Sequence, residues 1–205
     1  MKMKRLLLLL VMPLMVSCSS KTFDSKEKLW TYLKDVDNGY LQQKNVNGFE
    51  FSLLYKPTDL LVVQELSEKL TGKEREKKIK VLREKYNKYL YFSLSMSKNG
   101  QELLSVTPNN KQQFGSMVNQ LAFRMGEKVH LFTSTKDTIP ITDYIYPRMY
   151  GISKSTDILL VYPRDQKHLT SKELNLSIED LGIYTGEVKF KISVDNINNE
   201  PTLKL

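Results

Sequence analysis

The spacing of apolar residues changes along the chain and separates helical segments from extended ones. An apolar side chain at every third or fourth position is typical of a helix with one face in the core. The run at 60–63 is apolar throughout, so a buried strand remains an alternative there. The pattern predicts a helix that Asp24 caps and residues 37–39 end, then one that Thr58 caps at 59–70, and others at 73–88 and 111–125.

Particular side chains are expected to face the core from these helices. They are Leu29, Leu33 and Val36 in the first helix, Ile79, Leu82 and Tyr86 in the third, and Phe114, Val118 and Leu121 in the last.

Two Asn-Gly pairs predict β-hairpins, because both residues of a two-residue turn need positive φ angles. Asn47-Gly48 is expected to join strands at 40–46 and 49–55. Asn99-Gly100 is expected to join a strand at 90–97, in which apolar residues alternate with serines and a tyrosine, to a returning strand at 102–106.

After residue 127 the period of two dominates. Strands are predicted at 129–133, 139–146, 157–162, 174–178 and 186–194, and the tail at 195–205 is expected to be a strand exit. Helices followed by strands indicate an α+β fold with a mostly antiparallel sheet and about four helices concentrated in the N-terminal two-thirds. One sheet covered by helices and a small β-sandwich appended near residue 127 both remain open. Because no linker of Pro, Gly and Ser interrupts the chain, a single domain over 26–205 is favoured.

The first 18 residues follow a different rule. Three basic residues precede an apolar run at 6–16 that is too short to span a bilayer, and Ser17 then precedes Cys18, the chain's single cysteine. The segment Met15-Val16-Ser17-Cys18 resembles the lipobox of bacterial lipoproteins. We therefore expect a signal peptide at 1–17 and a tether at 18–25; a secretory peptide or an uncleaved anchor helix is the alternative.

The resemblance to lipoproteins implies cleavage before Cys18 and lipid attachment at Cys18. The lipid makes the membrane the first expected partner, since two or more acyl chains anchor a protein stably. Ser19 after the cysteine resembles the outer-membrane class, with the protein facing the periplasm. Lipidation also consumes the single thiol, so neither disulfides nor thiol chemistry are expected.

The chain carries a formal charge of +8, of which Lys2, Lys4 and Arg5 would leave with the signal, so that +5 remains. A basic excess suits anionic lipid or acidic glycan as a neighbour, and the export signal argues against nucleic acid. His130 and His168 do not have the spacing of metal ligands. We expect no metal, no cofactor and no catalytic residues, although side chains distant in sequence could still form an enzyme site.

Two Tyr-Pro-Arg units are the best binding candidates, because tyrosine and arginine are favoured where proteins bind partners. The alternative is that the tyrosines fill the rim of the sheet and the prolines mark strand exits. The candidate residues are Tyr144, Tyr146, Arg148 and Tyr150 around the first unit, and Tyr162 and Arg164 in the second.

Taken together, the sequence favours a lipid-anchored binding or accessory subunit of an envelope assembly. An enzyme acting on envelope or imported polymers and a structural lipoprotein contacting cell-wall glycan are the alternatives.

Overall fold

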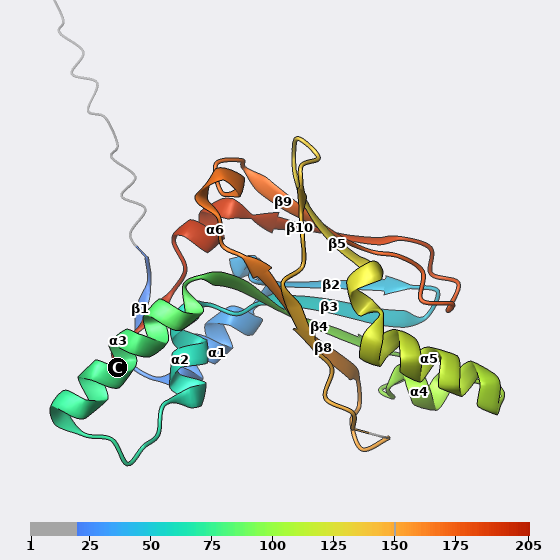
Figure 1. Cartoon of the computed structure of the whole chain (residues 1–205), viewed down its shortest axis with the longest axis horizontal. Coiled ribbons are helices and arrows are strands. Elements are labelled where there is room, and N and C mark those ends of the chain that lie inside the picture. Colours follow the sequence, from blue (N-terminus) through green and yellow to red (C-terminus); the bar gives the residue numbers. More distant parts are fainter. Residues whose placement is uncertain (1–19, 150) are drawn as a thin grey trace, which may run out of the picture.

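The computed structural model describes residues 20–149 and 151–205, whose strands form two antiparallel sheets and one short parallel pair (Figure 1). The five-stranded sheet has the order β2 (Leu41–Val46), β3 (Phe49–Tyr55), β4 (Tyr89–Ser97), β8 (Thr156–Pro163) and β7 (Asp143–Ile145). The four-stranded sheet has the order β10 (Val188–Ser193), β9 (Glu173–Ile178), β5 (Val129–Thr133) and β6 (Thr138–Ile139). The parallel pair is β1 (Thr22–Phe23) with β11 (Thr202–Leu203).

Helices lie at both ends of the five-stranded sheet, with α1, α2 and α3 at the left of Figure 1 and α4 and α5 at the right. The predicted α+β class is confirmed, with most helices in the N-terminal two-thirds. The helices are α1 (Lys26–Lys34), α2 (Thr58–Glu65), α3 (Gly72–Tyr86), α4 (Leu103–Val106), α5 (Lys111–Phe123) and α6 (Val194–Asn198), with 3₁₀ turns at Val36–Asn38, Met125–Glu127 and Gln166–His168.

The inward faces of the two large sheets share one hydrophobic core. On β4 the alternation places Phe92 and Leu94 in this core and Ser93 and Ser95 on the opposite face. β8 lies between β4 and β7, so the five-stranded sheet takes strands from both sides of residue 127. The apolar pattern therefore fixes which face each strand buries, while the pairing partners come from distant parts of the chain.

The first predicted hairpin is confirmed, and the second is not. Asn47 and Gly48 have φ values of 52° and 77°, and β2 pairs with β3 on either side of them. Asn99 and Gly100 form a similar turn, but the residues expected to return as a strand form α4. The reason is that β3 and β8 already occupy both edges of β4, which leaves no edge free for a returning strand.

Helix ends differ from prediction where a neighbouring residue makes the better cap. Ser25, rather than Asp24, accepts the N–H of Lys28 and caps α1. Thr58 lies inside α2, whose N-cap is Pro57, and this helix ends at Glu65 rather than at residue 70. The 60–63 segment is thus helical.

Several side chains and segments also lie elsewhere than the pattern predicts. Val36 is 51% exposed because α1 ends before it, and Phe114 is 42% exposed because Met117 and Leu121 provide the buried face of α5. The predicted strand at 139–146 divides at Pro140, which cannot donate a ladder hydrogen bond, into β6 and β7 of different sheets. The tail at 195–205 forms most of α6 and all of β11, and β11 pairs with two residues of the expected tether.

A buried ion pair ties the C-terminal segment to the rest of the fold. Arg164 donates to the Glu200 carboxylate at 3.0 Å, and their side chains are 9% and 14% exposed. The same guanidinium donates to Asn87 Oδ1 and to the carbonyl of Ile197, while Glu200 also accepts the Tyr55 hydroxyl at 2.6 Å. Residues from β3, α6 and the ends of α3 and β8 therefore meet at one charged centre.

Removing one partner of this pair is expected to leave an uncompensated buried charge. Arg164→Met should lower the free energy of unfolding by about 3–5 kcal/mol, measured by urea denaturation. Lys28→Met provides the control, because its pair with Asp24 is exposed and such pairs contribute about 0–1 kcal/mol. The double variant Arg164→Met/Glu200→Leu should recover part of the loss. An Arg164→Met protein as stable as the control would contradict this role.

Candidate functional site

The structure separates the two Tyr-Pro-Arg units. β7 and β8 are antiparallel neighbours, so the unit after Ile145 and the unit at the end of β8 leave the sheet in opposite directions. Tyr162 is fully buried and packs against Phe92, with ring centroids 6.2 Å apart. Arg164 belongs to the buried ion pair. The second unit therefore lies in the interior, and the two units do not form one continuous surface.

The first unit lies at the edge of the five-stranded sheet. Tyr144 and Tyr146 are half-buried against the core, and the Tyr144 hydroxyl accepts the N–H of Met125. Arg148 lies over the exposed ring of Phe123, 5.4 Å from its centroid. Tyr150 and Cys18 fall outside the described residues.

The His130 ring is held by ordinary polar contacts, whereas the buried Nδ1 of His168 has no hydrogen-bond partner among the described residues. His130 is 2.9 Å from Glu179, which also pairs with Lys128, and these contacts hold the pKa of the Glu179 carboxyl below its usual value. His168 lies in the 3₁₀ turn after β8. Across residues 20–149 and 151–205, no group of three His, Cys, Asp or Glu side chains is placed to hold a metal ion.

A polar cleft of about 410 Å³ opens at the end of the sandwich where α5 lies. This volume falls in the range of small-molecule sites, which is about 300–1,000 Å³. Parts of the chain that are distant in sequence line this cleft. They are the start of β3, the turn after β4, the α4–α5 region, and the loop between β9 and β10. The side chains that matter most are Phe49, Lys98, Thr107, Asn109, Gln113, Ser116, Gln120 and Tyr184, and we call this site the polar cleft.

One carboxylate organises the loop between β9 and β10. Asp180 accepts the backbone N–H groups of Gly182, Ile183, Tyr184 and Gly186 at 2.8–3.1 Å. Burial alone would raise the pKa of this carboxyl, but the four donors outweigh it and hold the pKa below its ordinary value. The loop is therefore built around an ionised group.

The same loop presents Tyr184 to solvent in an unusual backbone conformation. Tyr184 has a φ of 60° and is 87% exposed. A non-glycine residue in this region costs roughly 1–3 kcal/mol and needs surrounding contacts to hold it. Asn47 of the β2–β3 turn donates its side-chain amide to the Tyr184 carbonyl, and Gln120 of α5 donates to the carbonyl of Leu181.

The positive charge in the cleft belongs to Lys98, which lies over an aromatic ring. The Lys98 ammonium lies 4.5 Å from the centroid of the buried Phe49 ring. The aliphatic part of the Lys98 side chain lies near Gly48: a Cβ built on this glycine would be 3.9 Å from Lys98 Cε. The side chains that line the cleft, all of them described, include no carboxylate and no imidazole. Lys98 has no ion pair with any described residue.

Helix α5 turns a polar stripe toward the cleft, because Gln113, Ser116 and Gln120 recur at helical spacing. Gln113 Oε1 accepts the N–H of Asn109, which leaves the Gln113 amide nitrogen available as a donor. The Thr107 hydroxyl is buried at the wall of the cleft and has no hydrogen-bond partner among the described residues. Buried polar atoms are normally paired, so this site has unused hydrogen-bonding capacity.

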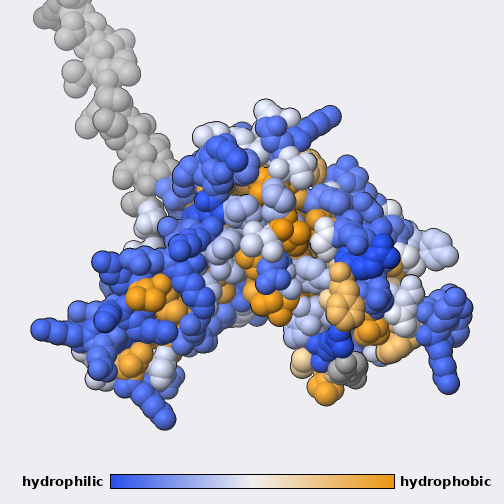
Figure 2. All heavy atoms as spheres, in the orientation of Figure 1, coloured by the Kyte–Doolittle hydropathy of each residue, from blue (hydrophilic) through white to orange (hydrophobic). Residues whose placement is uncertain are grey.

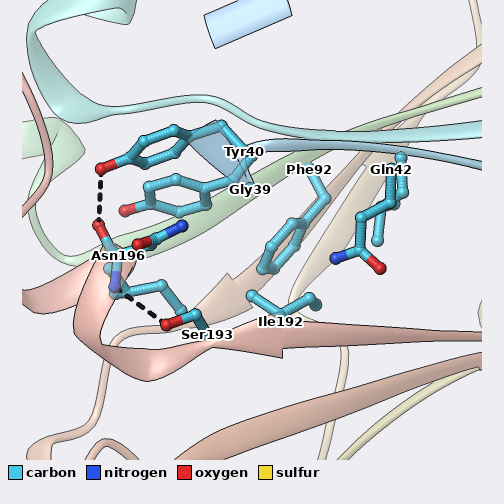
Figure 3. A pocket seen from close by; sticks show the side chains of 10 residues that line it. Gly39, Tyr40, Gln42, Phe92, Ile192, Ser193 and Asn196 are labelled. Carbon is cyan, nitrogen blue, oxygen red and sulfur yellow. Dashed lines mark hydrogen bonds between the residues drawn. The ribbon is translucent and has the colours of Figure 1, made fainter. Parts of the chain in front are cut away.

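Two other hollows fit a ligand less well. On the outer face of the five-stranded sheet, hydroxyls and carboxylates satisfy one another, as in the pairs Ser95 with Asp157 and Ser97 with Glu50. Between β2 and β10 a cavity of about 10 Å³ has room for about one water molecule. Figure 3 shows Tyr40 beside it, donating to the carbonyl of Asn196.

Sequence reasoning missed the polar cleft because the residues that line it are spread over more than 130 positions of the sequence. The Asn-Gly turns and the α5 helix were predicted, but nothing in the local pattern indicates that Asn47 would reach Tyr184. The one available signal is the pair of glycines at 182 and 186 around a tyrosine, next to an acidic residue. That pattern indicates an organised loop, not its partners.

Comparisons with known proteins leave the family open. No known protein family and no curated protein matches the sequence. The structure is similar to a crystal structure of a novel protein of unknown function from Burkholderia pseudomallei K96243, with a TM-score of 0.39 and 11% identity over 82% of this chain and 83% of that one.

The loop that presents Tyr184 should depend on the charge of Asp180. Because the pKa is lower in the folded protein than the ordinary value of 3.8, the stabilisation is complete above that value and is lost as the pH falls through the folded pKa. The protection factors of the loop amides at 182–186, which compare exchange with the intrinsic rate at the same pH, should therefore fall at low pH.

Asp180→Asn should raise exchange at these amides at pH 7 as well, since hydrogen bonds to a charged group contribute about 1.5–3 kcal/mol. Asp195→Asn, in α6, is the matched control and should leave the loop unchanged. Equal protection in both variants would contradict the role of Asp180.

Proposed function

We propose that this chain is a lipid-anchored protein of the cell envelope that binds a ligand or partner through the polar cleft. The observation that carries the proposal is the position of the cleft relative to the start of the folded chain. Figure 1 places β1 at one end of the longest axis and α5, the β2–β3 turn and the β9–β10 loop at the other. An anchor before β1 would therefore hold the cleft away from the membrane.

The short distance from Cys18 to the fold supports this orientation. Thr22 and Phe23 of β1 pair with β11, and β11 is held in turn by Asp59, which accepts the N–H of Leu203. Three residues separate Cys18 from β1, and three extended residues span roughly 10 Å. The end of the molecule that carries β1 would then stay close to the lipid headgroups.

Helix α3 lies at the same end and has seven basic residues against three acidic ones. Figure 2 shows hydrophilic side chains over this region. A basic surface near anionic headgroups gains electrostatic attraction of about 1 kcal/mol per charge, which fits the basic excess of the chain. Within the described residues, no helix combines the length and the apolar character needed to cross a bilayer; attachment in this proposal rests on the lipid.

Attachment is tested at Cys18. Cys18→Ala should abolish incorporation of labelled fatty acid and block cleavage of the signal peptide, because the acceptor thiol is gone. Ser17→Ala keeps a small residue before the cysteine and should still be labelled. Normal processing and membrane retention of the Cys18→Ala chain would overturn the proposal.

Orientation is tested with fluorescence quenching by nitroxide-headgroup lipid. Trp30 is the chain's single tryptophan and lies on α1, which contacts β1. The lipidated chain in vesicles should show clear quenching of Trp30. In a Trp30→Phe background, a reporter placed by Tyr184→Trp should be quenched much less. Equal quenching of the two reporters would show that the cleft is not held away from the membrane.

A further inference from the structure

The electrostatics of the polar cleft select for a negative charge on whatever binds there. Lys98 is the single lysine or arginine in the lining, and the lining has no acidic side chain. Its ammonium lies 4.5 Å from the centroid of the Phe49 ring, a cation–π contact that favours this position of the side chain. An unopposed cation in a partly enclosed site attracts an anion more strongly than one on an open surface.

The remaining polar groups match a ligand rich in hydroxyls. Gln120 uses its amide nitrogen on Leu181, so its oxygen is left as an acceptor, whereas Gln113 uses its oxygen on Asn109, so its nitrogen is left as a donor. The Ser116 hydroxyl can both donate and accept. A sugar hydroxyl also does both, and it satisfies mixed donors and acceptors better than an apolar or purely anionic ligand does.

Tyr184 adds an aromatic face at the edge of the cleft. The residue is 87% exposed, yet its backbone is held by Asp180 and by Asn47. Tyrosine presents a large contact area with few rotatable bonds, so ordering it costs little. The C–H face of a pyranose ring packs on such a surface while its hydroxyls stay free at the rim.

We infer that the polar cleft binds an acidic saccharide, a sugar ring that bears a carboxylate. Lys98 binds the carboxylate, Tyr184 packs on the ring, and the amides of α5 bind the hydroxyls. This inference rests on the proposal that the cleft is the binding site of the protein. An acidic peptide could also pair with Lys98 and, through its backbone C=O and N–H groups, with Gln113 and Gln120, but it has no pyranose face to pack on Tyr184.

The test compares two ligands that differ only at one carbon. Methyl glucuronide carries a carboxylate where methyl glucoside carries a hydroxymethyl group. With the full chain purified in detergent at pH 7, saturation-transfer NMR titrations should give a Kd for the glucuronide about three- to tenfold lower than for the glucoside. Equal affinities for the two sugars, or no detectable binding of either, would overturn the inference.

Variants then assign the preference to its residues. Lys98→Met should remove the difference between the two sugars, whereas Lys69→Met, at an exposed lysine between α2 and α3, should preserve it. Tyr184→Ala should weaken both sugars together, and Tyr184→Phe should bind both as the unaltered chain does. A preference that survives Lys98→Met would overturn the assignment, provided that circular dichroism shows each variant folded.

A blocked glutamate dipeptide tests the other class of ligand. It should bind more weakly than the glucuronide, and tighter binding of the dipeptide would overturn the saccharide assignment. Because these titrations use purified protein, they do not depend on anchoring. An unaltered chain that takes up no labelled fatty acid, or equal quenching of the two reporters, would count against the envelope proposal alone. An unaltered chain that does not prefer the glucuronide would count against the ligand class alone.

Discussion

The end of the fold that carries β1 and β11 depends on the contact between Arg164 and Glu200. Arg164 directly follows β8, which runs between β4 and β7, and Glu200 precedes β11, which pairs with β1. Burial alone would lower the pKa of the guanidinium, but Tyr55 and Glu200 outweigh it and raise that pKa above its ordinary value. The first and last strands are therefore tied to the interior by this ion pair and by Asp59, which pairs with Arg83 and accepts the N–H of Leu203.

In the part of the chain that the structure describes, the opposite end of the two large sheets has no ion pair buried to the same degree and is assembled largely from loops. Asp180 closes the β9–β10 loop through backbone donors, and Asn47 and Gln120 join that loop to the first hairpin and to α5. These contacts are individually modest, and they order a surface that keeps unused polar groups. An end joined by a buried ion pair and an opposite end with a polar cleft suit the proposed protein, which is anchored at one end and binds a ligand at the other.

Local pattern predicted most elements because their cause is local. The alternation in β4 and the positive φ angles at Asn47-Gly48 depend on a few adjacent residues, and the structure confirms both. The failure at 102–106 has a different cause: an Asn-Gly turn formed, but β8 and β3 had taken both edges of β4. Strand competition of this kind involves residues more than 50 positions away, so no local pattern reports it.

The two Tyr-Pro-Arg units illustrate the same limit for function. Their residues are alike in sequence, but antiparallel pairing of β7 and β8 sends them to opposite ends of the sheet. The polar cleft, in contrast, combines Lys98, α5 and Tyr184, which share no motif.

The sequence by itself determined the α+β class, the faces that the strands bury, and the two tight turns, because period, volume and φ preference belong to short segments. Only the tertiary structure decided which strands are neighbours, which arginine is buried and which side chains gather in a cleft. Those outcomes depend on contacts between segments that are distant in sequence, and these contacts form only when the sheets pack together.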